Sequence, residues 1–163
     1  MKGVFLPGDS TAEVREYDVP RPGPGQLLLR MGIAQPKGAA FASSLSDDFQ
    51  LSRQADFFAA GGIGRQYGRV SGDINPIHLS SITAKLFGFK RAIAHGMWTK
   101  ARALATLMPR EPAEQAEAVD EFTTPLFLPA RASLWSARTE DSALFEVRNA
   151  RGDKPHLRGK VTY

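Results

Sequence analysis

The sequence predicts an α+β fold in which an antiparallel sheet wraps around one long central helix. Apolar residues recur every three or four positions over residues 96–108, which is typical of a helix. From Val119 onward the apolar residues alternate with a period of two, which is typical of strands buried on one face. A helix with so broad an apolar stripe needs a flat partner, and a sheet can supply it.

The apolar stripe of the predicted central helix is interpreted as core. Stripes at helical spacing usually pack against other elements rather than bind ligands. Pro109 follows the stripe and bounds the helix. The residues that form or widen the stripe are Met97, Trp98, Ala101, Leu104, Ala105, Leu107 and Met108.

The C-terminal part of the chain is predicted to be a meander of strands. Residues 122–128 contain Pro125 and are expected to form an irregular or edge strand. Alternation predicts further strands at residues 132–138, 143–148 and 156–163, with a turn at residues 149–153. In the last strand, the side chains expected to face solvent are His156, Arg158 and Lys160, and those expected to face the core are Leu157, Val161 and Tyr163.

Two short helices are predicted in the middle of the chain. Arg53–Ala60 fits a helix that has Phe57 and Phe58 on its buried side and ends at the two glycines that follow. Ser80 suits the N-cap of a second helix, which Gly88 ends. The two helices lie on either side of the stretch that carries the candidate chemistry.

Residues 71–78 read Ser-Gly-Asp-Ile-Asn-Pro-Ile-His and place an acid, Asp73, five residues before a base, His78. Asn75 can hydrogen-bond within its own turn, and Pro76 removes backbone freedom, so the loop can hold both side chains in register. Histidine titrates near neutral pH, and an aspartate buried beside it can act as a partner base or a proton relay. Such a pair suits the addition of water to an activated double bond.

Gly96 opens the predicted central helix and is the candidate oxyanion site. The unpaired N–H groups and the dipole at a helix N-terminus favour negative charge, and a glycine lets a substrate oxygen approach closely. Adding water to an α,β-unsaturated thioester leaves negative charge on the thioester oxygen. The chemistry therefore needs an acid, a base and an oxyanion site, and the motif together with Gly96 can supply all three.

Two stretches of this sequence resemble one known family. Residues 67–78, Tyr-Gly-Arg-Val-Ser-Gly-Asp-Ile-Asn-Pro-Ile-His, and residues 94–97, Ala-His-Gly-Met, are similar to the MaoC-like, R-specific enoyl-CoA hydratases. The similarity continues through residues 127–129 and 154–157 and covers about residues 50–163. The resemblance implies a hot-dog fold and usually a dimer.

The resemblance implies roles for four residues. It assigns water activation to Asp73 and His78, oxyanion binding to the Gly96 amide, and support of the substrate site to Asn75. The expected activity is that of a hydro-lyase of fatty acid metabolism that hydrates a trans-2-enoyl thioester, as acyl-CoA, to the (R)-3-hydroxyacyl form and back. Coenzyme A enters as part of the substrate, and no separate cofactor is expected. The alternative is a recombined or truncated hot-dog module that folds and oligomerises without turnover.

Residues 1–33 differ from the rest of the chain. Their short β-type runs, separated by proline and glycine, predict hairpins and resemble the first strands of zinc-type medium-chain alcohol dehydrogenases. That activity is excluded, because the chain has no cysteine and the glycine cluster at residues 61–64 lacks dinucleotide-binding spacing. With residues 34–50 read as a linker, we divide the chain into a strand-rich segment and linker of unclear origin (1–50) and a MaoC-like hot-dog domain (51–163).

Composition narrows the classes of partner. The net charge is +4, but the cations are scattered and no basic run is interleaved with aromatic residues, so nucleic-acid binding is not expected. No apolar run is long enough to span a membrane, and no secretory signal precedes the first strands. A chain without cysteine is compatible with a reducing cytoplasm. We expect a cytoplasmic homodimer or higher homo-oligomer that binds acyl-CoA, without a membrane partner.

Structural roles are predicted for the remaining candidates. His95 is expected to cap the helix or shape the loop, His156 to lie on a solvated face, and Ser71 to make a loop hydrogen bond. The three histidines lack metal-ligand spacing on one element, so no catalytic metal is expected. The cations that could contact cofactor phosphates, among which the sequence does not choose, are Arg53, Arg65, Lys85, Lys90 and Arg91.

Overall fold

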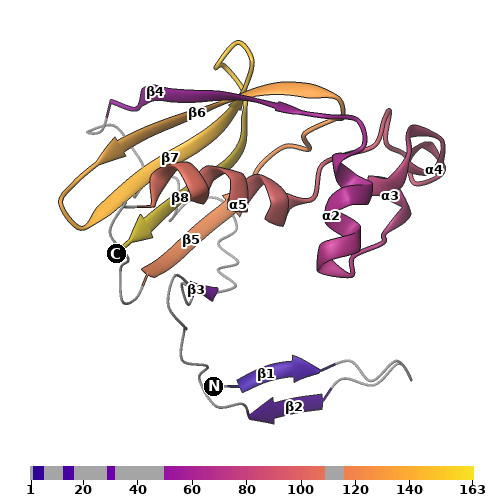
Figure 1. Ribbon diagram of the computed structural model, residues 1–163, viewed down its shortest axis with the longest axis horizontal. Helices are drawn as coiled ribbons and strands as arrows, with labels where there is room; N and C mark the ends of the chain where they lie inside the picture. The colour runs from indigo at the N-terminus through magenta and orange to yellow at the C-terminus, as the bar shows by residue number, and fades with distance from the viewer. Residues whose placement is uncertain (1, 6–12, 17–28, 32–49, 109–115) are drawn as a thin grey trace.

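A computed structural model describes residues 2–5, 13–16, 29–31, 50–108 and 116–163 (Figure 1). The strands are β1 (Lys2–Phe5), β2 (Glu13–Glu16), β3 (Leu29–Met31), β4 (Ser52–Ala59), β5 (Ala116–Phe122), β6 (Ala130–Arg138), β7 (Ser142–Asn149) and β8 (Pro155–Thr162). The helices are α2 (Ile63–Ser71), α3 (Pro76–Leu79), α4 (Ser81–Leu86) and α5 (Gly96–Leu107).

The main sheet has the strand order β3-β5-β8-β7-β6-β4. All of its pairings are antiparallel except that of β3 with β5, which is parallel. Figure 1 shows α5 lying across this sheet, with α2, α3 and α4 gathered at one end of the molecule. The predicted α+β fold, a sheet wrapped around one long helix, is confirmed.

The core lies between α5 and the inner face of the sheet. On β7, Ala143, Phe145 and Val147 are fully buried and alternate with more polar residues, as the sequence predicts. The helix begins and ends within one residue of the predicted bounds. Its buried face is rotated from the predicted stripe, because Ala101 and Ala105 are exposed. Leu104 and Leu107 of the predicted stripe are buried as expected, and the residues that replace the two alanines on the buried face are Thr99, Lys100 and Ala103.

An ion pair joins α5 to the sheet. Lys100 of α5 pairs with Asp120 of β5, and their side chains are only 5% and 6% exposed. Charged groups this deeply buried need a partner, since an unpaired charge in a protein interior is very costly. The pair explains how a lysine can occupy the buried face of the central helix.

The predicted helix at Arg53–Ala60 is wrong, since these residues form strand β4, which pairs with β6. The side chain of Phe58 is 61% exposed, whereas Ala59 is buried and Phe57 is half-buried. This inward and outward alternation has the period of a strand. The edge of β6 offers backbone hydrogen bonds that local helix propensity cannot match, so tertiary pairing decides the conformation.

The structure agrees with several smaller predictions about the N-terminal segment and the connections between elements. The β1–β2 pair is an antiparallel hairpin, as expected for the N-terminal segment, and Leu29–Met31 joins the main sheet as β3. The predicted helix after Ser80 is α4. After Phe122 the chain is irregular up to β6, apart from a bridge between Ile93 and Phe127. All but the last residue of the predicted linker (34–50) lies outside the described residues, and the division of the chain near residue 50 stays a prediction.

Candidate active site

Helix α2, which the sequence analysis did not identify, packs its backbone directly against the motif. A Cβ placed on Gly68 would lie 2.7 Å from the carbonyl oxygen of Asp73, and one on Gly64 would collide with the carbonyl oxygen of His78. Only glycine allows so close an approach. These two glycines, one turn apart on the buried face of α2, therefore bring the helix onto both ends of the motif.

Side chains of the motif hold its backbone in place. The Asp73 Oδ1 atom accepts a hydrogen bond from the Asn75 N–H at 3.2 Å, and Asn75 Oδ1 accepts from the Ile77 N–H at 3.2 Å. Asn75 is thus the N-cap of α3, with proline at the first helical position. Ser71 Oγ donates to the Tyr67 carbonyl at 2.9 Å. The predicted turn bonds of Asn75 and Ser71 are both confirmed.

His78 is a buried histidine of the candidate site. Its side chain is 8% exposed, and its Nδ1 lies 2.9 Å from the carbonyl oxygen of Ile93. Because a carbonyl can only accept, Nδ1 carries the proton of the neutral imidazole and Nε2 keeps its lone pair. Burial lowers the pKa of His78 below the ordinary value of 6.5, partly opposed by the bond to Ile93. Near neutral pH this histidine is therefore an unprotonated base through Nε2.

His95 lies against both members of the acid–base pair. Its ring stacks on that of His78 with a centroid separation of 3.7 Å, and its Nε2 donates to the Asp73 carbonyl oxygen at 3.0 Å. The same Nε2 lies 3.6 Å from the Asp73 carboxylate. His95 occupies the N-cap position of α5, but its side chain makes no capping bond. Of the two predicted alternatives for His95, capping the helix or shaping the loop, the structure therefore favours shaping the loop.

Asp73, His78 and His95 each have a side-chain atom that could bind a metal ion, a carboxylate oxygen or a ring nitrogen, and these three atoms lie within 4.8 Å of one another. Both histidines use one nitrogen to donate to a carbonyl oxygen, and the N–H of His95 is turned toward Asp73. These hydrogen bonds suit proton transfer better than metal coordination, which needs lone pairs that converge. The Asp73 side chain is 53% exposed in the described part of the chain, so this carboxylate lies beside the buried His78 without being buried itself.

Gly96 begins α5, as predicted. The first helical hydrogen bond is donated by the Thr99 N–H to the His95 carbonyl at 3.1 Å, so the amide of Gly96 precedes the bonded turns of the helix. A Cβ on Gly96 would lie 2.7 Å from the ring of Phe122. The glycine is therefore required by the close approach of Phe122 as well as by the open helix N-terminus.

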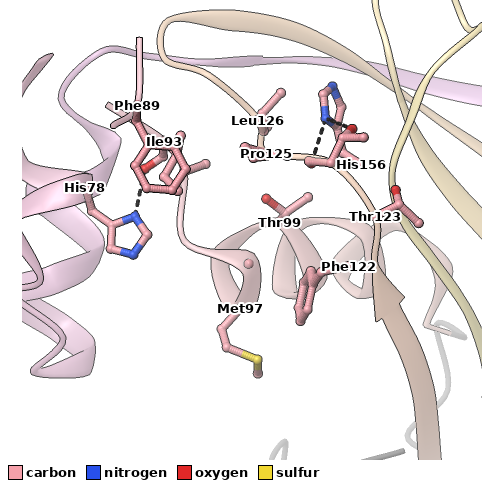
Figure 2. Close-up of a pocket in the computed structure, with 13 residues that line it drawn as sticks. His78, Phe89, Ile93, Met97, Thr99, Phe122, Thr123, Pro125, Leu126 and His156 are labelled. Atoms are coloured by element: carbon pink, nitrogen blue, oxygen red, sulfur yellow. Dashed lines mark hydrogen bonds between the residues drawn. The ribbon is translucent and has the colours of Figure 1, made fainter. Parts of the chain in front are cut away.

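His78 and Gly96 line the same cavity, which has a volume of about 440 Å³. Figure 2 shows His78 and His156 on opposite sides of this group of residues, with Met97, Thr99 and Phe122 between them. Most of the lining is apolar, which suits an acyl group rather than a sugar or a nucleotide base. The remaining apolar lining residues are Phe89, Ile93, Ala94, Pro125 and Leu126.

His156 also lines this cavity, so its predicted place on a solvated face is wrong. Its Nδ1 lies 3.1 Å from the Thr124 carbonyl oxygen, and burial lowers the pKa of the imidazole. The irregular chain after β5 lies against the start of β8 at this point, because the Thr123 N–H donates to the His156 carbonyl at 3.1 Å and the hydroxyls of Thr123 and Thr124 donate to the Pro155 carbonyl. Pro125 was the available signal, because a proline that breaks a strand lets the chain cross its neighbour.

The described residues contain no helix that is both long and apolar enough to cross a bilayer. The phosphate-contact candidates differ in their surroundings. Arg53 pairs with Asp56 at 2.6 Å, and the Arg65 guanidinium donates to the Leu79 carbonyl at 2.8 Å. For Lys85, Lys90 and Arg91, which are all exposed, the structure leaves the choice open.

Three comparisons place this chain among known proteins. The family described as MaoC like domain matches residues 64–158. The 3-hydroxyacyl-thioester dehydratase X of Mycobacterium tuberculosis is 43% identical over 97 residues, which are 60% of this chain and 34% of that protein. The chain therefore spans about a third of the length of this curated relative.

Solved structures show the same fold. A crystal structure of HtdX from M. tuberculosis matches with a TM-score of 0.62 at 38% identity, over 67% of this chain and 46% of that chain. The unliganded R-hydratase PhaJ1 of Pseudomonas aeruginosa matches with a TM-score of 0.58 at 24% identity, over 72% of this chain and 81% of that chain. Together with the sheet around α5, these likenesses show that the fold is the hot-dog fold implied by the sequence.

Proposed function

This chain belongs to the MaoC-like domain family, and we propose that it is a hydro-lyase that adds water to a trans-2-enoyl thioester to give the (R)-3-hydroxyacyl thioester, or removes it. The supporting observation is that His78, with its lone pair on Nε2, lies within 4.8 Å of Asp73 and lines a cavity together with Gly96. The named activity of the relative, a 3-hydroxyacyl-thioester dehydratase, agrees with this reaction.

In the proposed hydration, a water molecule lies between His78 and Asp73. Nε2 of His78 takes a proton from this water as its oxygen attacks the β-carbon of the substrate. The electron pair of the double bond moves through the α-carbon to the thioester oxygen. The α-carbon then receives a proton from the Asp73–His78 pair, so one water is added overall and both residues return to their starting state.

The negative charge on the thioester oxygen is accepted by the N-terminus of α5. The amide of Gly96 donates to this oxygen, and the helix dipole favours the charge. Asn75 supports the site indirectly, because it caps α3, the helix that carries His78. We assign His95 a similar supporting role, since its hydrogen bond to the Asp73 carbonyl at 3.0 Å fixes the loop that carries the acid.

The test is hydration of a short enoyl thioester, followed by the loss of its ultraviolet absorbance. Asp73→Asn and His78→Gln should each lower kcat/KM by about 10²–10⁴-fold, the usual contribution of a positioned acid or base. Phe58→Ala is a control, because this exposed residue of β4 lies outside the cavity. Wild-type rates equal to those of either active-site variant would exclude the proposed mechanism.

A second candidate function is a hot-dog module that folds and oligomerises without turnover. The half-exposed carboxylate of Asp73 favours it, because a hydration site works best when closed to bulk water. This candidate predicts a folded protein that gives no hydration at any acyl length. The same assay therefore separates the two functions.

The remaining parts of the proposal concern the setting of the enzyme. We propose acyl-CoA as a substrate, with coenzyme A as part of it and no separate cofactor, and the cytoplasm as the location. We also propose a homodimer or higher homo-oligomer, because β4 is an edge strand of the main sheet in the described part of the chain. Sedimentation should give a mass of at least two chains at micromolar concentration, and a monomer would contradict the proposal.

A further inference from the structure

Large apolar side chains are exposed mainly in one short segment. Of the seven exposed large hydrophobic residues in the described part of the chain, five lie within residues 70–87. Isolated exposed apolar residues are common, but such a concentration marks an interaction surface. These five residues, with their exposed fractions, are Val70 (87%), Ile74 (70%), Ile82 (79%), Leu86 (81%) and Phe87 (59%).

The positive charge of the chain is concentrated in the same segment. Residues 60–95 contain five cations and one anion, Asp73. The net charge of the whole chain is +4, so the rest of the sequence is close to neutral. All five cations are exposed, and none forms an ion pair with another described residue. These cations are Arg65, Arg69, Lys85, Lys90 and Arg91.

Helix spacing puts the two kinds of side chain on one face of α4. Lys85 and Leu86 follow Ile82 by three and four residues, so a cation and two apolar side chains share this face. On α2, Arg65 and Arg69 are one turn apart, and Val70 is exposed on an adjoining face. Helix α3, which begins the base-bearing turn, packs against both of these helices (Figure 1). The mixed apolar and cationic surface therefore borders the active site, where the Asp73 carboxylate is open to solvent.

We propose that this surface, the five apolar and five cationic residues named above, docks an acidic carrier protein that presents the acyl thioester on a phosphopantetheine arm. The inference rests on the proposed function and names the partner that delivers its substrate. Carboxylates of the carrier would pair with the cations, and its apolar side chains would cover Ile82 and Leu86. The arm would then reach the cavity beside His78. Acyl-CoA has the same arm and would still react, but without the docking contacts.

Other occupants fit this surface less well. In a symmetric dimer formed through it, the same five cations would face one another, and like charges across an interface are strongly unfavourable. Coenzyme A alone offers phosphates for the cations but no apolar partner for the side chains on α4. An anionic lipid surface could match both features, so the experiment has to distinguish it from a carrier protein.

The experiment compares one enoyl group on three carriers: an acidic acyl carrier protein, coenzyme A and N-acetylcysteamine. Arg69→Glu combined with Lys85→Glu should raise KM for the protein-borne substrate about tenfold or more, through loss of charge complementarity. The KM for the N-acetylcysteamine thioester should be unchanged. Leu86→Ser should have the same selective effect. The matched control is Arg151→Glu, an exposed charge reversal far along the sequence from this surface.

A binding measurement keeps this proposal separate from the proposed function. Calorimetry with the acyl carrier protein, in its unloaded form, should detect binding that the charge reversal weakens and added salt abolishes. If catalysis fails but this binding remains, the docking surface stands and the hydro-lyase proposal is wrong. Equal effects of the variants on all three substrates, or binding only to anionic phospholipid vesicles, would overturn the docking proposal.

Discussion

The β6–β8 meander and the α2–α4 segment are stabilised in different ways. In the meander, Phe145 and Val147 of β7 and Leu157 and Val161 of β8 are fully buried against α5. In the helical segment most side chains are exposed, and its short helices depend on caps and turn bonds such as those of Asn75 and Ser80. Apolar burial thus builds the scaffold, whereas specific hydrogen bonds shape the site.

This difference predicts that stability and activity can be changed separately. Burial energy grows with the apolar area removed from water and is spread over many contacts. A turn bond contributes only about 1 kcal/mol, but it sets the position of a reacting group. Substitutions in the meander should therefore unfold the protein, and substitutions around the motif should leave it folded but slow.

The largest effect on stability is expected from Phe145→Ala. The side chain is fully buried between the sheet and α5, so its truncation should lower the free energy of unfolding by about 3–5 kcal/mol. Denaturant unfolding measures this loss. Phe58→Ala, at a side chain that is 61% exposed, is the matched control and should change stability by less than about 0.5 kcal/mol. Equal losses of unfolding free energy in the two variants would contradict the claim that apolar burial in the meander stabilises the fold.

The two regions also differ in how far the sequence predicts them. The strands of the meander were predicted with the correct inward residues, such as Phe145 and Val147, because one buried face imposes a period of two. The α5 helix was predicted nearly to its ends. Its buried face was predicted only in part: Leu104 and Leu107 are buried as expected, but Lys100 becomes compatible with burial only through Asp120, which lies twenty positions away in the sequence.

The elements around the site were predicted less well. The sequence predicts a helix where strand β4 lies, because the pairing of β4 with β6 is a long-range property. The α2 helix was missed, because its glycines lower helix propensity locally while allowing contact with the motif. The contact of His95 with Asp73 depends on how two loops meet. The motif itself identified the candidate residues, but only the folded chain defines their distances.

Gly96→Ala tests the start of α5, which lies between the β6–β8 scaffold and the α2–α4 segment that carries the motif. The added methyl group would displace Phe122 and crowd the amide at the start of α5. Alanine keeps the backbone N–H, so any loss of rate comes from blocked access to it. If the substrate oxygen can no longer reach this donor, kcat should fall by up to about 10²–10³-fold, which corresponds to about 3–4 kcal/mol in the transition state. Steady-state kinetics on folded protein measures the effect.

A double variant separates the two causes of this loss. Phe122→Ala removes the steric conflict, so Gly96→Ala combined with Phe122→Ala should regain stability relative to Gly96→Ala alone. If blocked access to the amide causes the loss of rate, the double variant should also regain activity. Full activity of Gly96→Ala by itself would contradict the oxyanion role of this amide.

The pH dependence of the rate tests the state of the base. Burial lowers the pKa of His78, so the neutral form that accepts a proton persists below pH 6.5. The value of kcat/KM should be level around neutral pH and fall about tenfold per unit below the lowered pKa. Between this pKa and 6.5 the unfolded chain binds more protons than the folded one, so stability should also fall as the pH falls. An acid limb that begins above pH 6.5 would contradict this assignment.

The smallest effect is expected from Ser80→Ala, which tests whether the caps of the helical segment matter to the site. Ser80 Oγ accepts from the Thr83 N–H at 3.1 Å, and Thr83 Oγ1 donates to the Pro76 carbonyl at 2.7 Å, so the cap ties α4 to α3. Removing the cap should cost about 1 kcal/mol of stability, and Ser80→Asp should restore it. Because α3 carries His78, kcat should fall in Ser80→Ala by an amount that also corresponds to about 1 kcal/mol, and it should recover in Ser80→Asp. A loss of stability without any change in kcat would mean that the motif is held in place by α2 alone.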